Sequence, residues 1–299
     1  MLHPFLTRLL LSITLLAASP AFAQLLSFQQ LLDRPDRPKA DQRIAYGDDA
    51  SQFGELWLPR GAGPHPVVLM IHGGCWQASL PGPELLAFQA DALRSAGVAV
   101  WSISYRRVGH AGGGYPGTFQ DVARGTDRLR QLATQYPLDL TRLVATGHSA
   151  GGHLALWAAA RPRIAVGSPL HAASPLPIAA VVAVAGVPDL AFASRQGLCG
   201  KSVSQLLDLD TRGQDAAVWA DVSPAALLPL HVRQTLVHGI YDGIVPPVQG
   251  HGYRAKATQL GDAVEIVNLD EAGHFELIAP WTPAGRQVVD RLVRATRAP

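Results

Sequence analysis

Residues 144–157 read VATGHSAGGHLALW and place Ser149 inside a Gly-x-Ser-x-Gly pattern. The residues before it are typical of a buried strand, and the small apolar residues after it are typical of a buried helix. A serine at such a strand-to-helix turn takes a tight backbone conformation, and the flanking glycines remove Cβ atoms that would collide with neighbouring elements. The stretch therefore indicates a nucleophilic serine at the edge of a sheet. The alternative, a serine that caps an ordinary helix, leaves the glycines unexplained.

The rest of the chain repeats the strand-then-helix order. Near-continuous apolar runs rich in Val and Ile occur at residues 65–74, 97–107, 141–149, 178–187, 233–242 and 263–274. Runs that are apolar on both faces are typical of a parallel sheet covered by helices on both sides. Amphipathic helical patterns separate several of them, and two short alternating segments (43–47 and 54–59) predict antiparallel edge strands. The expected fold is a one-domain α/β fold with a mostly parallel central sheet.

Two features refine this plan. Thr118 and Asp121 form a Thr-x-x-Asp variant of the capping box and predict the start of a helix over residues 118–136. Residues 189–229 contain short helical fragments and no strand pattern. An insertion at that place would lie over the carboxyl ends of the strands, where open α/β sheets bind ligands, so we expect a small lid there. A loose surface crossover is the alternative.

A serine nucleophile needs a base and a group that orients the base. Asp242 follows one apolar run and is succeeded by a loop with two prolines, and His274 follows the last run. The order Ser149, Asp242, His274 is the order of the catalytic residues in α/β-hydrolases. We therefore expect Asp242 to orient His274, and His274 to act as the base.

Other residues could take these two roles. Asp270 and Glu271 lie in the loop of His274 itself, and Asp189 follows the strand before the expected lid. His148 and His153 lie on the serine turn and its helix, whereas a base must approach from outside that turn; His238 at a strand end is expected to be structural. The sequence favours Asp242 and His274 over all of them. His148 is expected to lie in the substrate site.

The residues HGGCW, 72–76, follow the first long apolar run and supply a candidate oxyanion hole. An oxyanion hole consists of donors aimed at the charge that develops in the transition state. The expected donors are backbone amides of Gly73, Gly74, Cys75 and, after the nucleophile, Ala150. Trp76 is expected to line the substrate site. A plain tight turn would also use two glycines.

Taken together, HGGCW, SISYRR (102–107), YPGTFQDV (115–122), residues 137–159 and DGIVPP (242–247) resemble the α/β-hydrolase superfamily. The resemblance is to its carboxylesterase branch, which includes kynurenine formamidases and feruloyl-esterase-like hydrolases. It implies the α/β-hydrolase fold, with Ser149 as nucleophile, Asp242 as acid and His274 as base. Cys75 departs from the aromatic or small residue that is commoner at its position.

The N-terminal residues indicate export. Arg8 precedes an apolar run, and Ala21 and Ala23 stand at the −3 and −1 positions before Gln24, as in a cleaved secretory signal peptide over residues 1–23. A membrane anchor is the alternative, but the run is shorter than the ~20 residues of a spanning helix. The expected location is periplasmic or secreted. Residues 24–42 are expected to be an exposed lead-in, and the hydrolase domain is expected to cover 43–299.

The composition of the chain limits the classes of partner that are expected. The formal net charge is +2, and no Lys/Arg cluster indicates a nucleic-acid surface or an anionic membrane. No metal-binding or phosphate-binding motif is present apart from GGGYPG at 112–117, where Pro116 disfavours a phosphate turn, so no cofactor or metal is expected. The two cysteines, Cys75 and Cys199, could form a disulfide or remain free thiols.

These patterns predict a serine hydrolase that cleaves a small ester through an acyl-enzyme on Ser149. A kynurenine-formamidase-like amidase or a peptidase-like hydrolase is the alternative within enzymes. A non-catalytic binding module on a hydrolase fold is the alternative outside them.

Overall fold

The computed structural model describes residues 25–213 and 216–297. The predicted signal peptide lies outside these residues. Within them, no helix has both the length and the apolar character needed to cross a membrane.

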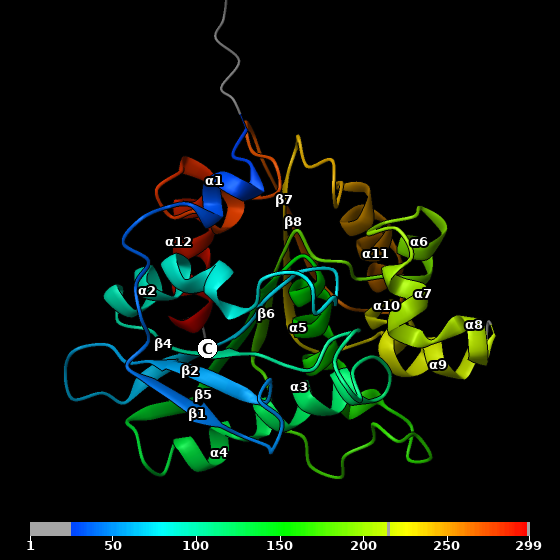
Figure 1. The fold of residues 1–299 in the computed structure, drawn as a ribbon, viewed down its shortest axis with the longest axis horizontal. Coiled ribbons are helices and arrows are strands. Elements are labelled where there is room, and N and C mark those ends of the chain that lie inside the picture. Colours follow the sequence, from blue (N-terminus) through cyan, green and yellow to red (C-terminus); the bar gives the residue numbers. More distant parts are fainter. Residues whose placement is uncertain (1–24, 214–215, 298–299) are drawn as a thin grey trace, which may run out of the picture.

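Among the residues that the structure describes, a single sheet of eight strands forms the centre of the fold (Figure 1). Its spatial order is β1-β2-β4-β3-β5-β6-β7-β8. The strands from β4 to β8 in this order run parallel, and β2 pairs antiparallel with both β1 and β4. The strands are β1 Gln42–Ala45, β2 Phe53–Trp57, β3 His65–Ile71, β4 Ala99–Ile103, β5 Leu138–His148, β6 Ala180–Val184, β7 Arg233–Gly239 and β8 Val264–Leu269.

Helices cover both faces of the sheet. α2 and α12 pack on one face, and α3, α5 and α11 lie on the other (Figure 1). The helices outside the insertion are α1 Phe28–Leu32, α2 Ala87–Ser95, α3 Gly117–Asp127, α4 Leu129–Leu132, α5 Ala150–Ala160, α11 Val248–Gln259 and α12 Pro283–Arg297, and the 3-10 turns are η1 Pro83–Leu86, η2 Arg161–Arg163 and η3 Glu276–Ile278.

Burial explains the sequence pattern. β4 and β6 are buried along their whole length, whereas the edge strand β1 is largely exposed. Central strands covered on both faces need apolar residues at every position, and an edge strand does not. The α/β fold with a mostly parallel sheet and helices on both faces is therefore confirmed.

The segment expected to be an exposed lead-in is only partly exposed. Asp33 to Asp36 are exposed, but Leu31 of α1 is completely buried in the core. The prediction for residues 24–42 is therefore wrong in this part. The charges and prolines that suggested exposure begin after α1, and the apolar residues before them pack on the domain.

The described residues of the segment 189–229 form five short helices, as the fragmentary pattern suggested. These are α6 Leu190–Arg195, α7 Ser202–Leu207, α8 Leu209–Arg212, α9 Ala216–Val222 and α10 Pro224–Leu227. Figure 1 shows this insertion beside α5, on the same side of the sheet.

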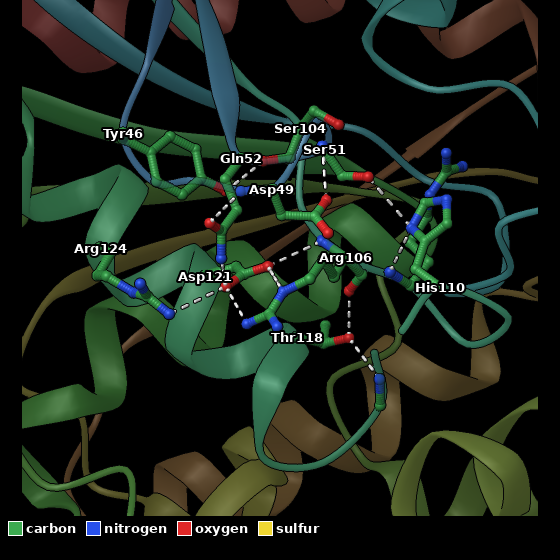
Figure 2. A network of polar contacts seen from close by, with 12 residues as sticks. Tyr46, Asp49, Ser51, Gln52, Ser104, Arg106, His110, Thr118, Asp121 and Arg124 are labelled. Carbon is green, nitrogen blue, oxygen red and sulfur yellow. Dashed lines mark hydrogen bonds and ion pairs between the residues drawn. The ribbon is translucent and has the colours of Figure 1, made fainter. Parts of the chain in front are cut away.

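The expected capping box at Thr118 and Asp121 is not formed, and both side chains serve a larger network (Figure 2). α3 begins at Gly117 after Pro116, without a side-chain cap. The Thr118 hydroxyl donates to the Arg106 carbonyl and accepts from the Gly114 amide. Asp121, which is fully buried, accepts two hydrogen bonds from the Arg106 guanidinium at 2.8 Å and one from the Gln52 amide at 2.6 Å. The network joins the β1–β2 turn, α3 and the segment after β4.

Candidate active site

Ser149 lies at the turn between β5 and α5, with φ 57° and ψ −121°. This is an unfavourable conformation for a residue with a side chain. Its glycine neighbours make the turn possible. A Cβ on Gly147 would lie 2.2 Å from the Gly151 carbonyl oxygen, and one on Gly151 would lie 2.0 Å from the Ile71 carbonyl oxygen. The Gly-x-Ser-x-Gly pattern is thus a packing requirement of the turn.

His274 and Asp242 come together from two different loops. The His274 Nδ1–H donates to Asp242 Oδ2 at 2.7 Å. The other carboxylate oxygen, Oδ1, accepts the amides of Ile244 and Val245, both at 2.8 Å. The Asp242 side chain is fully buried. The carboxylate is therefore fixed by its own loop and holds the imidazole with Nε2 free to accept a proton.

Ser149 and His274 face the same pocket. The Ser149 hydroxyl makes no hydrogen bond with any residue that the structure describes, and its side chain remains open to this pocket. Contacts between a nucleophile and its base are often loose without substrate and tighten when substrate is bound.

The competing acids lie elsewhere. The Asp189 carboxylate caps α6 by accepting the Phe192 amide at 3.0 Å. Asp270 and Glu271 are exposed. Of these candidates only Asp242 is hydrogen-bonded to His274 in the described chain.

The competing histidines are all buried. His153 accepts the Trp76 indole N–H at Nδ1 (3.2 Å) and donates from Nε2 to the Val222 carbonyl (2.9 Å). The ring of His238 is buried against Gly250. His148 lines the pocket and donates from Nε2 to the His274 carbonyl at 3.0 Å. It thus holds in place the segment 270–278, here called the base loop because it carries the expected base, His274.

Burial sets the protonation of these histidines. It lowers the pKa of His153 and of His238 to about 4, and that of His72 to about 3. Burial, followed by the nearby His274 ring, also lowers the pKa of His148 well below its usual value. All four are therefore neutral near pH 7.

The loop that follows β3 brings Gly73 directly against the serine turn. A Cβ on Gly73 would lie 2.7 Å from the His148 carbonyl oxygen and 3.2 Å from the Ser149 Cβ. Gly74, Cys75 and Trp76 follow with positive φ values of 99°, 47° and 57°. The amides of Gly74 and Cys75 donate to no acceptor among the residues described here, and both residues line the pocket. Ala150 begins α5 beside them.

Trp76 does not lie in the pocket. Its indole is 1% exposed and contacts His153 beneath the loop. The prediction that Trp76 lines the substrate site is therefore wrong. The positive φ of the residue turns the side chain into the core, a reversal that cannot be seen in the sequence motif.

Three interactions support this loop from outside. Arg107 donates from one guanidinium nitrogen to the carbonyls of Gln77 (3.2 Å), Leu80 (2.6 Å) and Pro81 (3.1 Å). The Tyr105 hydroxyl donates to the His72 carbonyl at 2.8 Å. A disulfide joins Cys75 to Cys199, which lies in the insertion between α6 and α7. The disulfide left open by the sequence is therefore present.

The pocket beside Ser149 has a volume of about 300 Å³. Its lining residues are Phe28, Gly74, Cys75, Leu80, Leu85, His148, Ser149, Ile244, His274, Phe275 and Ile278. No described residue of the insertion 189–229 is among them. The segment expected to be a lid is instead bonded to the loop after β3 through the Cys75–Cys199 disulfide. Nor do the described residues contain a cluster of His, Cys, Asp or Glu suited to a metal ion.

Sequence reasoning missed three residues of this site. Phe28 lies far from any motif in the chain. Arg107 is part of SISYRR, but its contacts with a loop 26 to 30 residues away leave no local signal. Glu276 accepts the amides of Leu26 and Gly273 and was hidden in the base loop.

A mostly parallel sheet with a strained serine turn after β5, and with an acid and a histidine after β7 and β8, defines the α/β-hydrolase fold. The chain belongs to the BD-FAE family, whose sequence profile matches residues 55–256. The resemblance to α/β-hydrolases is thereby confirmed.

Individual relatives agree with this placement. Over 264 residues the chain is 25% identical to esterase LipQ of Mycobacterium tuberculosis (strain ATCC 25618 / H37Rv), covering 83% of this chain and only 62% of the relative. Esterase B from Lactobacillus rhamnosis has a similar structure, with a TM-score of 0.72, 19% identity and coverage of 88% and 89% of the two chains. A truncated carbohydrate esterase from gut microbiota also matches, with a TM-score of 0.72, 20% identity and coverage of 86% and 95%. At these identities the two solved structures show the fold alone.

Proposed function

We propose that the protein is a serine carboxylesterase that cleaves a small ester through an acyl-enzyme on Ser149. The observation that carries the proposal is the shared pocket of Ser149 and the hydrogen-bonded pair His274–Asp242. The names of the relatives, which include esterases, support the same reaction class.

The chemistry follows from the positions of these groups. The Ser149 oxygen attacks the ester carbonyl carbon while His274 Nε2 takes the hydroxyl proton, and Asp242 stabilises the imidazolium that forms. The carbonyl oxygen becomes an oxyanion, which the amides of Gly74, Cys75 and Ala150 stabilise. The carbon–oxygen bond to the alcohol then breaks, and His274 returns its proton to the leaving oxygen.

The second half releases the acid. Water gives its proton to His274 and attacks the acyl carbon, and the bond to Ser149 then breaks with return of the proton to the serine oxygen. Each proton is thus carried by His274.

We also propose that the protein is exported by a cleaved signal over residues 1–23 and acts in the periplasm or outside the cell. The Cys75–Cys199 disulfide supports this location, because disulfides persist mainly in oxidising compartments. Mass spectrometry of the protein recovered from its native host tests it. A chain that begins at Gln24 is expected, and one that still begins at Met1 would contradict it.

The reaction is tested with Ser149→Ala on p-nitrophenyl acetate. The variant is expected to lose at least about 10⁴-fold in kcat, because the covalent step is removed. Ser95→Ala, at an exposed serine that ends α2, is the matched control and should stay within about twofold of the wild type. Wild-type turnover by Ser149→Ala would contradict the mechanism. Activity confined to N-formylkynurenine or aminoacyl amides would contradict the ester assignment.

A further inference from the structure

The segment of residues 25–32, here called the N-terminal strap, lies against the base loop. Leu31 is fully buried in the core. The Leu26 amide donates to the Glu276 carboxylate, whose second oxygen accepts the Gly273 amide at 2.9 Å. One buried carboxylate therefore joins the strap to the residue before His274.

The strap is also ordered internally. The Ser27 hydroxyl accepts the Gln30 amide at 3.2 Å, and the Gln30 side chain accepts the Ser27 amide at 2.8 Å, which is a complete capping box. Arg37 donates to the Leu32 carbonyl at 2.8 Å, where α1 ends. Fixed at both ends, α1 holds its side chains in defined positions.

Phe28 extends from α1 into the lining of the pocket that contains Ser149. Its ring lies 5.4 Å from that of Phe275, which in turn lies 5.1 Å from the His274 ring. Phe28 is half-buried and comes from the strap, whereas the other lining residues come from the end of β5 and from the loops and 3-10 turns of the domain. Phe28 therefore forms a part of the pocket wall that the central sheet and its loops do not supply.

The chemistry of the pocket restricts what it can hold. Leu80, Leu85, Ile244 and Ile278 complete the wall, and no Asp, Glu, Lys or Arg among the described residues lines it. Its volume of about 300 Å³ is at the low end of the roughly 300–1,000 Å³ of small-molecule pockets. An uncharged apolar group of limited length fits this space.

Resting on the proposed esterase function, we propose that the strap sets substrate specificity: Phe28 closes the pocket and limits the length of the ester's apolar chain. The apolar chain can belong to the acyl or to the alcohol part of the ester, because the Phe28 ring recognises an apolar group and not the ester atoms. Each methylene that gains apolar contact improves kcat/KM by roughly fourfold. The position of the Phe28 ring therefore determines which chain length is hydrolysed best.

The test compares chain-length ratios in two substrate series. The acyl series is p-nitrophenyl octanoate against butyrate, and the alcohol series is hexyl acetate against ethyl acetate. Phe28→Ala is expected to raise the long-to-short ratio of kcat/KM by about tenfold in one series, as two or so methylenes gain room. Phe28→Trp is expected to lower the same ratio.

The matched control is Phe88→Ala. Phe88 lies on α2 and packs edge-on against Trp281 at 5.1 Å, outside the pocket. Its variant loses the same ring and should keep both ratios within about twofold of the wild type. Melting temperatures of the variants show whether each is folded.

The outcomes separate the two claims. The role of the strap alone is overturned if the wild type is active but Phe28→Ala and Phe28→Trp both keep the chain-length ratios within twofold of it. It is also overturned if Phe88→Ala changes the ratios as much as Phe28→Ala does. A wild type that hydrolyses no ester of either series overturns the proposed function and this inference with it.

Discussion

Asp242 uses both carboxylate oxygens, one for the amides of its own loop and one for the His274 ring. The loop contacts fix the direction of the carboxylate without help from the imidazole. Hydrogen bonding to a carboxylate in turn selects the tautomer of the histidine, with the proton on Nδ1 and a free Nε2. The orientation and tautomer of the His274 ring are therefore set by a residue 32 positions away in the chain.

Asp242→Asn tests this dependence. The amide can present its N–H₂ to Nδ1 and so favours the wrong tautomer, and kcat should fall by about 10⁴-fold. The measurement is steady-state hydrolysis of a p-nitrophenyl ester. Asp270→Asn, at the exposed acid four residues before His274, is the control and should leave kcat within about twofold. Equal losses in the two variants would contradict the assignment of Asp242.

At the scale of elements, the loop after β3 is supported by parts of the chain that are remote in sequence. Arg107 binds three of its carbonyls, Trp76 contacts His153 on α5, and Cys75 is bonded to Cys199 in the insertion. The strands and the two motif turns could be predicted because apolar runs and glycine positions are signals within a short stretch of sequence. These supports could not be predicted, because each one joins residues that are far apart in the sequence and come together only in the folded chain.

The disulfide closes a separation of 124 residues in the chain. A cross-link of this length restricts the unfolded chain, and its removal should lower the free energy of unfolding by about 2–5 kcal/mol. The expected result for Cys75→Ser combined with Cys199→Ser is a lower midpoint in guanidinium denaturation. Wild type measured in reducing buffer should approach the variant. An unchanged midpoint in the double variant would show that the bond contributes nothing to stability.

In the whole molecule, the sheet could be predicted from the sequence, whereas the contribution of the N-terminal segment to the pocket could not. The near-continuous apolar runs predict the sheet, because central strands must be apolar on both faces. The prediction was wrong for the start of the chain, where Leu31 is buried and Phe28 reaches the pocket. A five-residue helix has too few turns for a clear periodic signal, so its contact with the domain was concealed by the charged residues that follow it.

Buried neutral histidines make the stability of the whole domain depend on pH. Burial holds the pKa of His72, His153 and His238 at about 3 to 4 in the folded protein, below the ordinary value of 6.5. The unfolded chain therefore takes up protons first as the pH falls. The stabilisation is complete above about pH 6.5 and is lost as the pH falls toward 4.

Each such histidine adds about 1.4 kcal/mol per pH unit to the slope of unfolding free energy in that window. His238→Asn should reduce the slope by about this amount, because one proton-binding site is removed from the unfolded chain. Denaturant titrations at several pH values between 4 and 6.5 measure it. Gln259→Asn, at an exposed and non-ionisable side chain of α11, is the control and should leave the slope unchanged. An unaltered slope in His238→Asn would contradict burial as the cause.

The central claim, that Ser149 is a nucleophile activated by His274, is tested most directly by covalent labelling with a fluorophosphonate. The intact wild-type protein should gain the mass of one phosphonyl group, and peptide mapping should place that group on Ser149. Ser149→Ala should gain none, and His274→Ala should react far more slowly. A wild-type protein that stays unlabelled, or one labelled at another serine, would contradict the account.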